Sequence, residues 1–140
     1  MIFLIWYNLN RTKGSSQSIV LLMKEKAMIN LEKKENPEKK GVIISVDGKI
    51  DTNGTEALRE KIRESLDDVD LRFVIIDLAK CDFITSVGLG MLVGAHKKAN
   101  AIGKKLAFVN LHKNIESIFR ITNLYTFFNV SSKAGQVWGE

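Results

Sequence analysis

The sequence predicts a single α/β domain: a mixed sheet of four to five strands with an antiparallel hairpin at its start and three to four helices. The chain has 140 residues, 45% hydrophobic and 26% charged, which is typical of a globular domain with one core. Short apolar runs alternate with segments of helical periodicity. A strand, a helix and a strand are expected at 41–46, 53–66 and 72–78, an order that favours a right-handed parallel crossover.

Residues 1–27 differ from the rest of the chain. Their apolar run Ile2–Tyr7 is far shorter than the about 20 residues of a membrane span, and basic residues follow it, unlike in a secretory signal. We therefore expect an N-terminal extension over residues 1–27 and a domain over residues 28–138. The extension is interpreted as disordered, as a mis-assigned translation start upstream of Met23 or Met28, or as an amphipathic membrane tether.

The domain is expected to open with a hairpin. Residues 28–34 alternate like a short edge strand, a turn follows at 36–40, and 41–46 is an apolar strand. The chain then leaves the sheet, and either Asp51 or Thr52 is placed to cap the helix expected at 53–66.

The stretch from the strand at 72–78 to Asn100 carries the most unusual pattern. A polar corner ends at Thr85, and a helix with three early glycines, Gly88, Gly90 and Gly94, begins at Ser86. A glycine inside a helix costs about 0.5–1 kcal/mol relative to alanine, so these positions indicate a spatial requirement. Serine is also a common helix N-cap, so a capping role alone would explain Ser86.

At 100° per residue this helix has two distinct faces. The face expected to pack on the sheet holds Leu89, Leu92, Val93, His96, Ala99 and Asn100. The opposite, outward face holds Val87, Gly90, Met91 and Gly94, small or apolar residues where a surface helix normally carries charge. Either a partner docks on this outward face or another segment of the chain, residues 1–27 among the candidates, covers it.

The rest of the chain is expected to add two strands and a helix. A strand is predicted at 106–110, and Asn114 is expected to cap a helix ending at Ile121, with Asn123 as a left-handed terminator. A last short strand is expected around 127–130, followed by a tail or a final helix to residue 138.

Composition and spacing argue against several classes of function. The net charge is +5, but four basic residues and one acidic residue lie in residues 1–27, so the rest carries only +2 and shows no nucleic-acid-binding motif. The single cysteine, Cys81, cannot form an internal disulfide and favours a reducing compartment, the cytoplasm. No metal or cofactor is predicted, because neither histidine has a ligand partner at suitable spacing.

No catalytic residues are predicted. His96 lies about 15 Å from Ser86 along the helix and faces the core, and His112 has no orienting carboxylate nearby in the sequence. The Gly88-x-Gly90 pair lacks the third glycine of a dinucleotide site. A nucleotide-binding or phosphotransfer enzyme is therefore the least favoured of three hypotheses.

The other two hypotheses come from a resemblance. The strand, the corner and Ser86-Val87-Gly88-Leu89-Gly90 at the helix start resemble the signature of the STAS domain, specifically of bacterial anti-sigma factor antagonists. The stretch Gly48–Asp51 resembles the family's Gly-Glu-Leu-Asp, and Thr122-Asn123-Leu124 resembles its Thr-Gly-Leu. Thr85 stands where the family has aspartate, and Val87 where it has a second hydroxyl residue. The resemblance covers residues 28–138.

The resemblance implies a STAS-like fold and a phosphorylation-controlled regulator of a bacterial stress response. Ser86 aligns with the serine that a partner kinase phosphorylates, and Thr85 is the back-up acceptor. The implied partners are an anti-sigma factor serine kinase and a phosphatase. The implied partner-binding residues are Asp51, Thr52, Thr85, Ser86, Val87, Gly88, Gly90, Met91 and Gly94. The alternative is a STAS scaffold or transporter-accessory module without phosphorylation.

Overall fold

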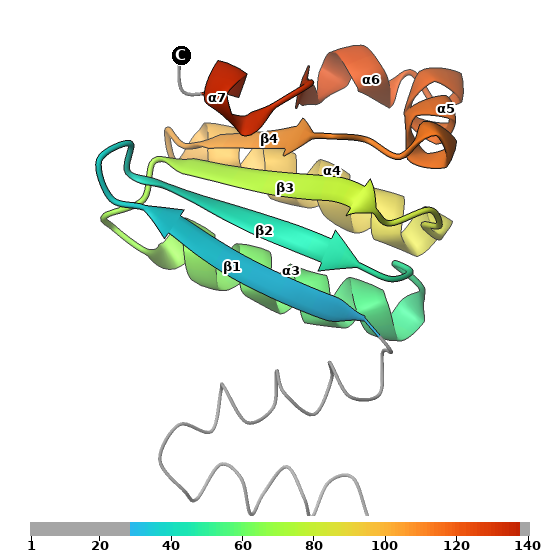
Figure 1. Cartoon of the computed structure of the whole chain (residues 1–140), viewed down its shortest axis with the longest axis horizontal. Coiled ribbons are helices and arrows are strands. Elements are labelled where there is room, and N and C mark those ends of the chain that lie inside the picture. Colours follow the sequence, from blue (N-terminus) through green and yellow to red (C-terminus); the bar gives the residue numbers. More distant parts are fainter. Residues whose placement is uncertain (1–28, 138–140) are drawn as a thin grey trace, which may run out of the picture.

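The computed structural model describes residues 29–137 and shows one five-stranded sheet with helices around it (Figure 1). The elements are, in order, β1 (Asn30–Asn36), β2 (Gly41–Asp47), α3 (Thr52–Asp67), β3 (Phe73–Lys80), α4 (Ser86–Ala101), β4 (Lys105–Val109), α5 (Lys113–Ile121), α6 (Leu124–Phe127), β5 (Asn129–Ser131) and α7 (Ala134–Val137). None of the helices within this range is long and apolar enough to cross a membrane.

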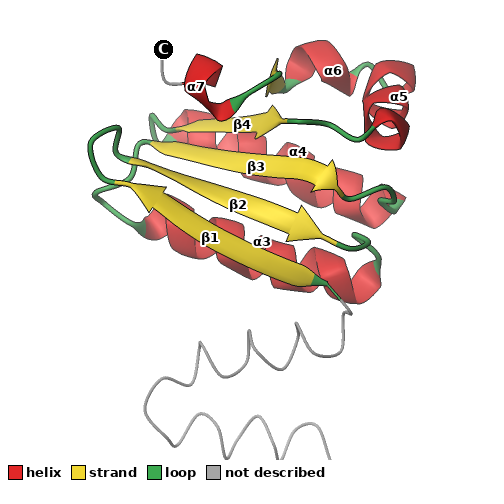
Figure 2. Ribbon diagram, viewed as in Figure 1, coloured by secondary structure: helices red, strands yellow, loops and turns green. Residues whose placement is uncertain are grey.

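The sheet is mixed, as the sequence predicts. β1 and β2 form the antiparallel hairpin, and β2, β3, β4 and β5 run parallel in that order. A helical segment connects each strand to its parallel neighbour, and the two long helices, α3 and α4, lie side by side on one face of the sheet (Figures 1 and 2). The described range holds five helices, more than the three to four expected, because two single turns of four residues, α6 and α7, are helical.

The main core lies between the sheet and the two long helices. Val42 pairs with Val74 and Ile44 with Ile76 across β2 and β3, and all four side chains are fully buried. Their neighbours in sequence point to the other face, where a smaller cluster, Ile75, Ala107, Val109 and Val137, is closed by α7. Both faces of the central strands are covered, which explains why their sequences are near-continuous apolar runs.

Several expected boundaries are wrong near the C-terminus. The cap of α5 is His112, whose Nδ1 accepts from the Asn114 N–H at 3.1 Å, so Asn114 lies inside the helix. The last strand begins at residue 129 rather than 127, because the Phe128 N–H donates to the Leu124 carbonyl at 2.8 Å and closes a helical turn first. The left-handed terminator is confirmed, with φ of 61° at Asn123.

Candidate functional site

The candidate site lies at the edge of the sheet where the parallel strands β2 and β3 end. The loop after β2 runs beside the loop after β3, since the Ile50 N–H donates to the Phe83 carbonyl at 2.9 Å and the Thr85 N–H donates to the Ile50 carbonyl at 3.0 Å. An isolated parallel bridge joins Ile50 to Ile84. These bonds bring Asp51 next to the start of α4, although the two are far apart in sequence.

The residue that caps α4 is Thr85 rather than Ser86. Thr85 has extended backbone angles, and its Oγ1 accepts from the Gly88 N–H at 3.0 Å. Ser86 is the first residue of the helix and is exposed, and its side chain makes no hydrogen bond within the described range. The capping explanation for Ser86 is therefore wrong, because its neighbour already holds that position.

Asp51 caps the N-terminus of α3, as Thr85 caps that of α4. Its Oδ1 accepts from the Gly54 N–H at 2.8 Å, which makes Asp51 the N-cap of α3 and leaves Thr52 exposed in the first turn. The choice that the sequence left open between Asp51 and Thr52 is thereby resolved. Both helices thus begin at this edge with their free N–H groups and positive dipole ends directed to the same side.

Gly88 is buried, and its close contacts explain why this position of α4 requires a glycine. A Cβ on Gly88 would lie 2.9 Å from Ile50 Cγ2, 2.9 Å from Ile84 Cγ1 and 3.1 Å from Thr55 Oγ1. Only a glycine lets α4 approach these side chains so closely. Gly90 and Gly94 are different, because a Cβ there would have no neighbour within 4 Å, and both residues are exposed.

The expected outward face is wrong for Met91, and Gly88, expected among the partner-binding residues, is buried as well. Met91 is only 9% exposed and lines an apolar groove of about 330 Å³ between α3 and α4, together with Arg59, Ile62, Arg63, Leu66, Gly94, Ala95 and Lys98. The physical reason is that α4 contacts two neighbours, the sheet and α3, so its buried arc is wider than one face. The exposed surface of α4 near Ser86 therefore consists of Val87, Gly90 and Gly94.

Sequence reasoning missed two residues at this edge. Phe83 is 43% exposed in the loop before Thr85, and the Nζ of Lys49 lies 5.3 Å from the centroid of its ring. An aromatic residue inside an otherwise polar corner was the available signal.

The Cys81 thiol and the His96 imidazole are both buried. Burial raises the pKa of the Cys81 thiol, which donates to the Phe83 carbonyl at 3.5 Å. Burial lowers the pKa of His96, whose ring centroid lies 4.9 Å from that of Phe127 and 5.6 Å from that of Phe128. Neither group is paired with Ser86 as a base, and no three metal-ligating side chains gather within residues 29–137.

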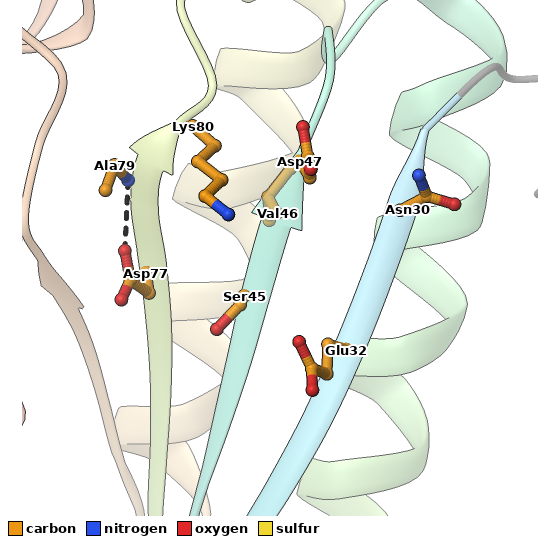
Figure 3. A pocket seen from close by; sticks show the side chains of 8 residues that line it. All are labelled: Asn30, Glu32, Ser45, Val46, Asp47, Asp77, Ala79 and Lys80. Carbon is orange, nitrogen blue, oxygen red and sulfur yellow. Dashed lines mark hydrogen bonds between the residues drawn. The ribbon is translucent and has the colours of Figure 1, made fainter.

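A second, polar hollow of about 200 Å³ lies on the sheet face opposite α3 and α4. Figure 3 shows its lining side chains on β1, β2 and β3: Asn30, Glu32, Ser45, Val46, Asp47, Asp77, Ala79 and Lys80. The dashed line marks the bond from the Ala79 N–H to Asp77 Oδ1, 3.0 Å long. Ser86 and the exposed surface of α4 do not contribute to this hollow.

The sheet edge at the start of α4 thus carries an exposed hydroxyl, that of Ser86, together with the exposed apolar side chains of Phe83 and Val87. The STAS domain model matches residues 28–136, and the chain belongs to the STAS domain family.

Several relatives carry a more specific description. The anti-sigma-B factor antagonist of Bacillus subtilis (strain 168) is 31% identical over 107 residues, which are 76% of this chain and 94% of that protein. The unphosphorylated form of the anti-sigma factor antagonist SpoIIAA superposes with a TM-score of 0.65 at 17% identity, over 77% of this chain and 93% of that one. The phosphorylated form of Bacillus SpoIIAA superposes with a TM-score of 0.60 at 17% identity, over 77% of this chain and 96% of that one. At these identities the solved structures show the fold.

Proposed function

We propose that this chain is an anti-sigma factor antagonist: it sequesters an anti-sigma factor serine kinase, and so frees a sigma factor, until the kinase phosphorylates Ser86. The single observation that supports this most is the position of Ser86. Its hydroxyl is exposed and without a hydrogen bond among residues 29–137, at the first position of α4 and beside the exposed Val87. The 31% identical relative is named for the same function.

Phosphorylation at this position leaves the fold intact. The phosphate would meet the free N–H groups and the positive dipole end of a 16-residue helix, a contribution of about 0.3–1 kcal/mol in its favour. It would also add about −1.5 to −2 charges to the surface that contacts the partner. At about 4 Å and an effective dielectric constant of about 20, the repulsion between one such charge and a negative charge of the partner is roughly 4 kcal/mol before screening. We expect a loss of about two to three powers of ten in affinity for the partner.

The capping bond favours Ser86 over Thr85 as the acceptor. The Thr85 hydroxyl is engaged with the Gly88 N–H, and a kinase would have to break this cap, which is worth about 1 kcal/mol. The proposed docking surface is formed by Asp51, Thr52, Thr85, Ser86, Val87, Gly90 and Gly94, on a domain of residues 28–138. A phosphatase would restore binding by removing the phosphate.

The test is to incubate the purified chain with each anti-sigma factor kinase of the source cells, with and without ATP. We expect one kinase to bind and then to release the chain in ATP, with mass spectrometry placing one phosphate on Ser86. Ser86→Ala should stay bound in ATP, Ser86→Asp should bind weakly, and Ser117→Ala, an exposed serine on α5, should behave as wild type.

Four outcomes would contradict the proposal. Binding without any phosphorylation would favour a scaffold that does not switch. A phosphate found only on Thr85, or Ser86→Asp binding as tightly as wild type, would exclude Ser86 as the switch. Binding to none of the kinases would refute the function itself.

A further inference from the structure

The loop after β2 carries an ammonium group that none of the ion pairs of residues 29–137 uses. Gly48 has φ of +131°, a conformation that other residues rarely adopt, and its N–H donates to the Lys80 carbonyl at 3.1 Å. The next bond along, from the Ile50 N–H to the Phe83 carbonyl, is 2.9 Å long. Between these two bonds, Lys49 is held beside the loop after β3, with its Nζ 5.3 Å from the centroid of the Phe83 ring.

The ring that faces Lys49 is itself exposed, and so is the apolar side chain on the other side of Ser86. Phe83 is 43% and Val87 60% exposed, and the two bracket Ser86 along the chain. Neither side chain gains its full burial energy in the isolated domain, which marks them as contact area for a partner. They extend the proposed docking surface from α4 into the loop after β3.

A partner that covers Phe83 also covers the Lys49 ammonium beside its ring and displaces water from it. Removing water from an unpaired ammonium is costly, so a stable complex needs an anion there. The nearby carboxylates do not supply it. Asp51 is engaged with the Gly54 N–H at 2.8 Å, and Asp82 forms no ion pair with Lys49. The anion has to come from the partner.

On the basis of the proposed function, we infer that Lys49 and Phe83 form a charge-selective anchor for an acidic segment of the anti-sigma factor. The segment places an apolar side chain over Phe83 and Val87 and an aspartate or glutamate carboxylate against Lys49 Nζ. Charge at this position then decides which anti-sigma factor is recognised. It also explains why a phosphate on Ser86 opposes binding, because it repels the carboxylate that the anchor requires.

The test measures the dissociation constant of the anti-sigma factor purified from the source cells, by calorimetry, against a matched set of variants. We expect Lys49→Glu to bind about 100-fold more weakly and Lys49→Met, which keeps the aliphatic stem, about 10-fold more weakly. Lys105→Glu is the matched control, because Lys105 is an exposed lysine at the start of β4, at the opposite end of the parallel strands, without an ion pair among residues 29–137, and it should stay within about twofold of wild type. All three variants should keep the wild-type melting temperature within about 2 °C, as expected of surface substitutions.

A charge swap makes the inference specific. An acidic residue of the anti-sigma factor, replaced by lysine, should restore binding to Lys49→Glu while weakening binding to wild type. If wild type binds and Lys49→Glu binds equally well, the anchor is refuted and the proposed function stands. If Lys49→Glu binds more tightly while Asp82→Lys binds more weakly, the partner segment is basic and the assigned charge is wrong. If wild type binds no anti-sigma factor, the proposed function fails and this inference fails with it.

Discussion

Gly88 offers a direct test of how α4, and with it Ser86, is positioned. The perturbation is Gly88→Ala, which adds one methyl group where Ile50 Cγ2 and Ile84 Cγ1 would each lie 2.9 Å away and Thr55 Oγ1 3.1 Å away. Ile50 is fully buried and β-branched, so its methyl group has no alternative rotamer to occupy without a shift of the loop. The added methyl group must displace either this loop or the start of α4.

The expected magnitude combines two opposing terms. Overpacking of this kind costs about 1–3 kcal/mol. Replacing glycine by alanine inside a helix stabilises the helix by about 0.8–1 kcal/mol. We therefore expect Gly88→Ala to lower the free energy of unfolding by about 0–2 kcal/mol, whereas Gly90→Ala and Gly94→Ala, at open positions, should raise it by about 0.5–1 kcal/mol. The difference between Gly88→Ala and Gly90→Ala is thus about 0.5–3 kcal/mol.

Urea unfolding of the three variants, monitored by circular dichroism, measures this difference. For a domain of this size each kcal/mol corresponds to about 4–8 °C in melting temperature, so thermal scans provide an independent check. If all three substitutions stabilise the protein equally, Gly88 does not sit in the tight contact described above, and the position of Ser86 is not fixed by that contact.

Four further predictions concern the same region and the chain ends. Met91→Lys should destabilise the domain by more than about 2 kcal/mol, as Leu92→Lys should, because both side chains are buried. A free energy of unfolding in urea within about 0.5 kcal/mol of wild type for Met91→Lys would show that this side chain faces solvent. Thr85→Ala should cost about 1 kcal/mol in the same assay, while Thr85→Ser should cost less because it keeps the cap. Burial lowers the pKa of His96, so below about pH 6.5 the unfolded chain binds a proton that the folded chain does not; the free energy of unfolding should fall with falling pH, and His96→Gln should remove this dependence. A chain beginning at Met28 should melt within a few degrees of the full chain, and a drop of more than about 8 °C would show that residues 1–27 pack onto the domain.

Local signals in the sequence were sufficient where the interaction itself is local. The strands at 41–46 and 72–78 follow from runs of residues that are apolar in succession, and the sheet that they form is the mixed one expected. Asp51 caps α3 through a bond to the residue three positions on, and Asn123 adopts a left-handed conformation just after α5. The resemblance at Ser86–Gly90 identified the family, which the match over residues 28–136 confirms.

Tertiary structure decided what depends on neighbours distant in sequence. Angular spacing alone places Met91 towards solvent, because it describes a helix with one buried face, whereas α4 packs on both the sheet and α3 and buries Met91. Serine and threonine can both cap a helix, and only the backbone path set by the bond between Thr85 and Ile50 makes Thr85 the cap and leaves the Ser86 hydroxyl without a hydrogen bond among the described residues. The sequence determined which residues could carry a switch, and the packing of the two loops determined which of them is exposed.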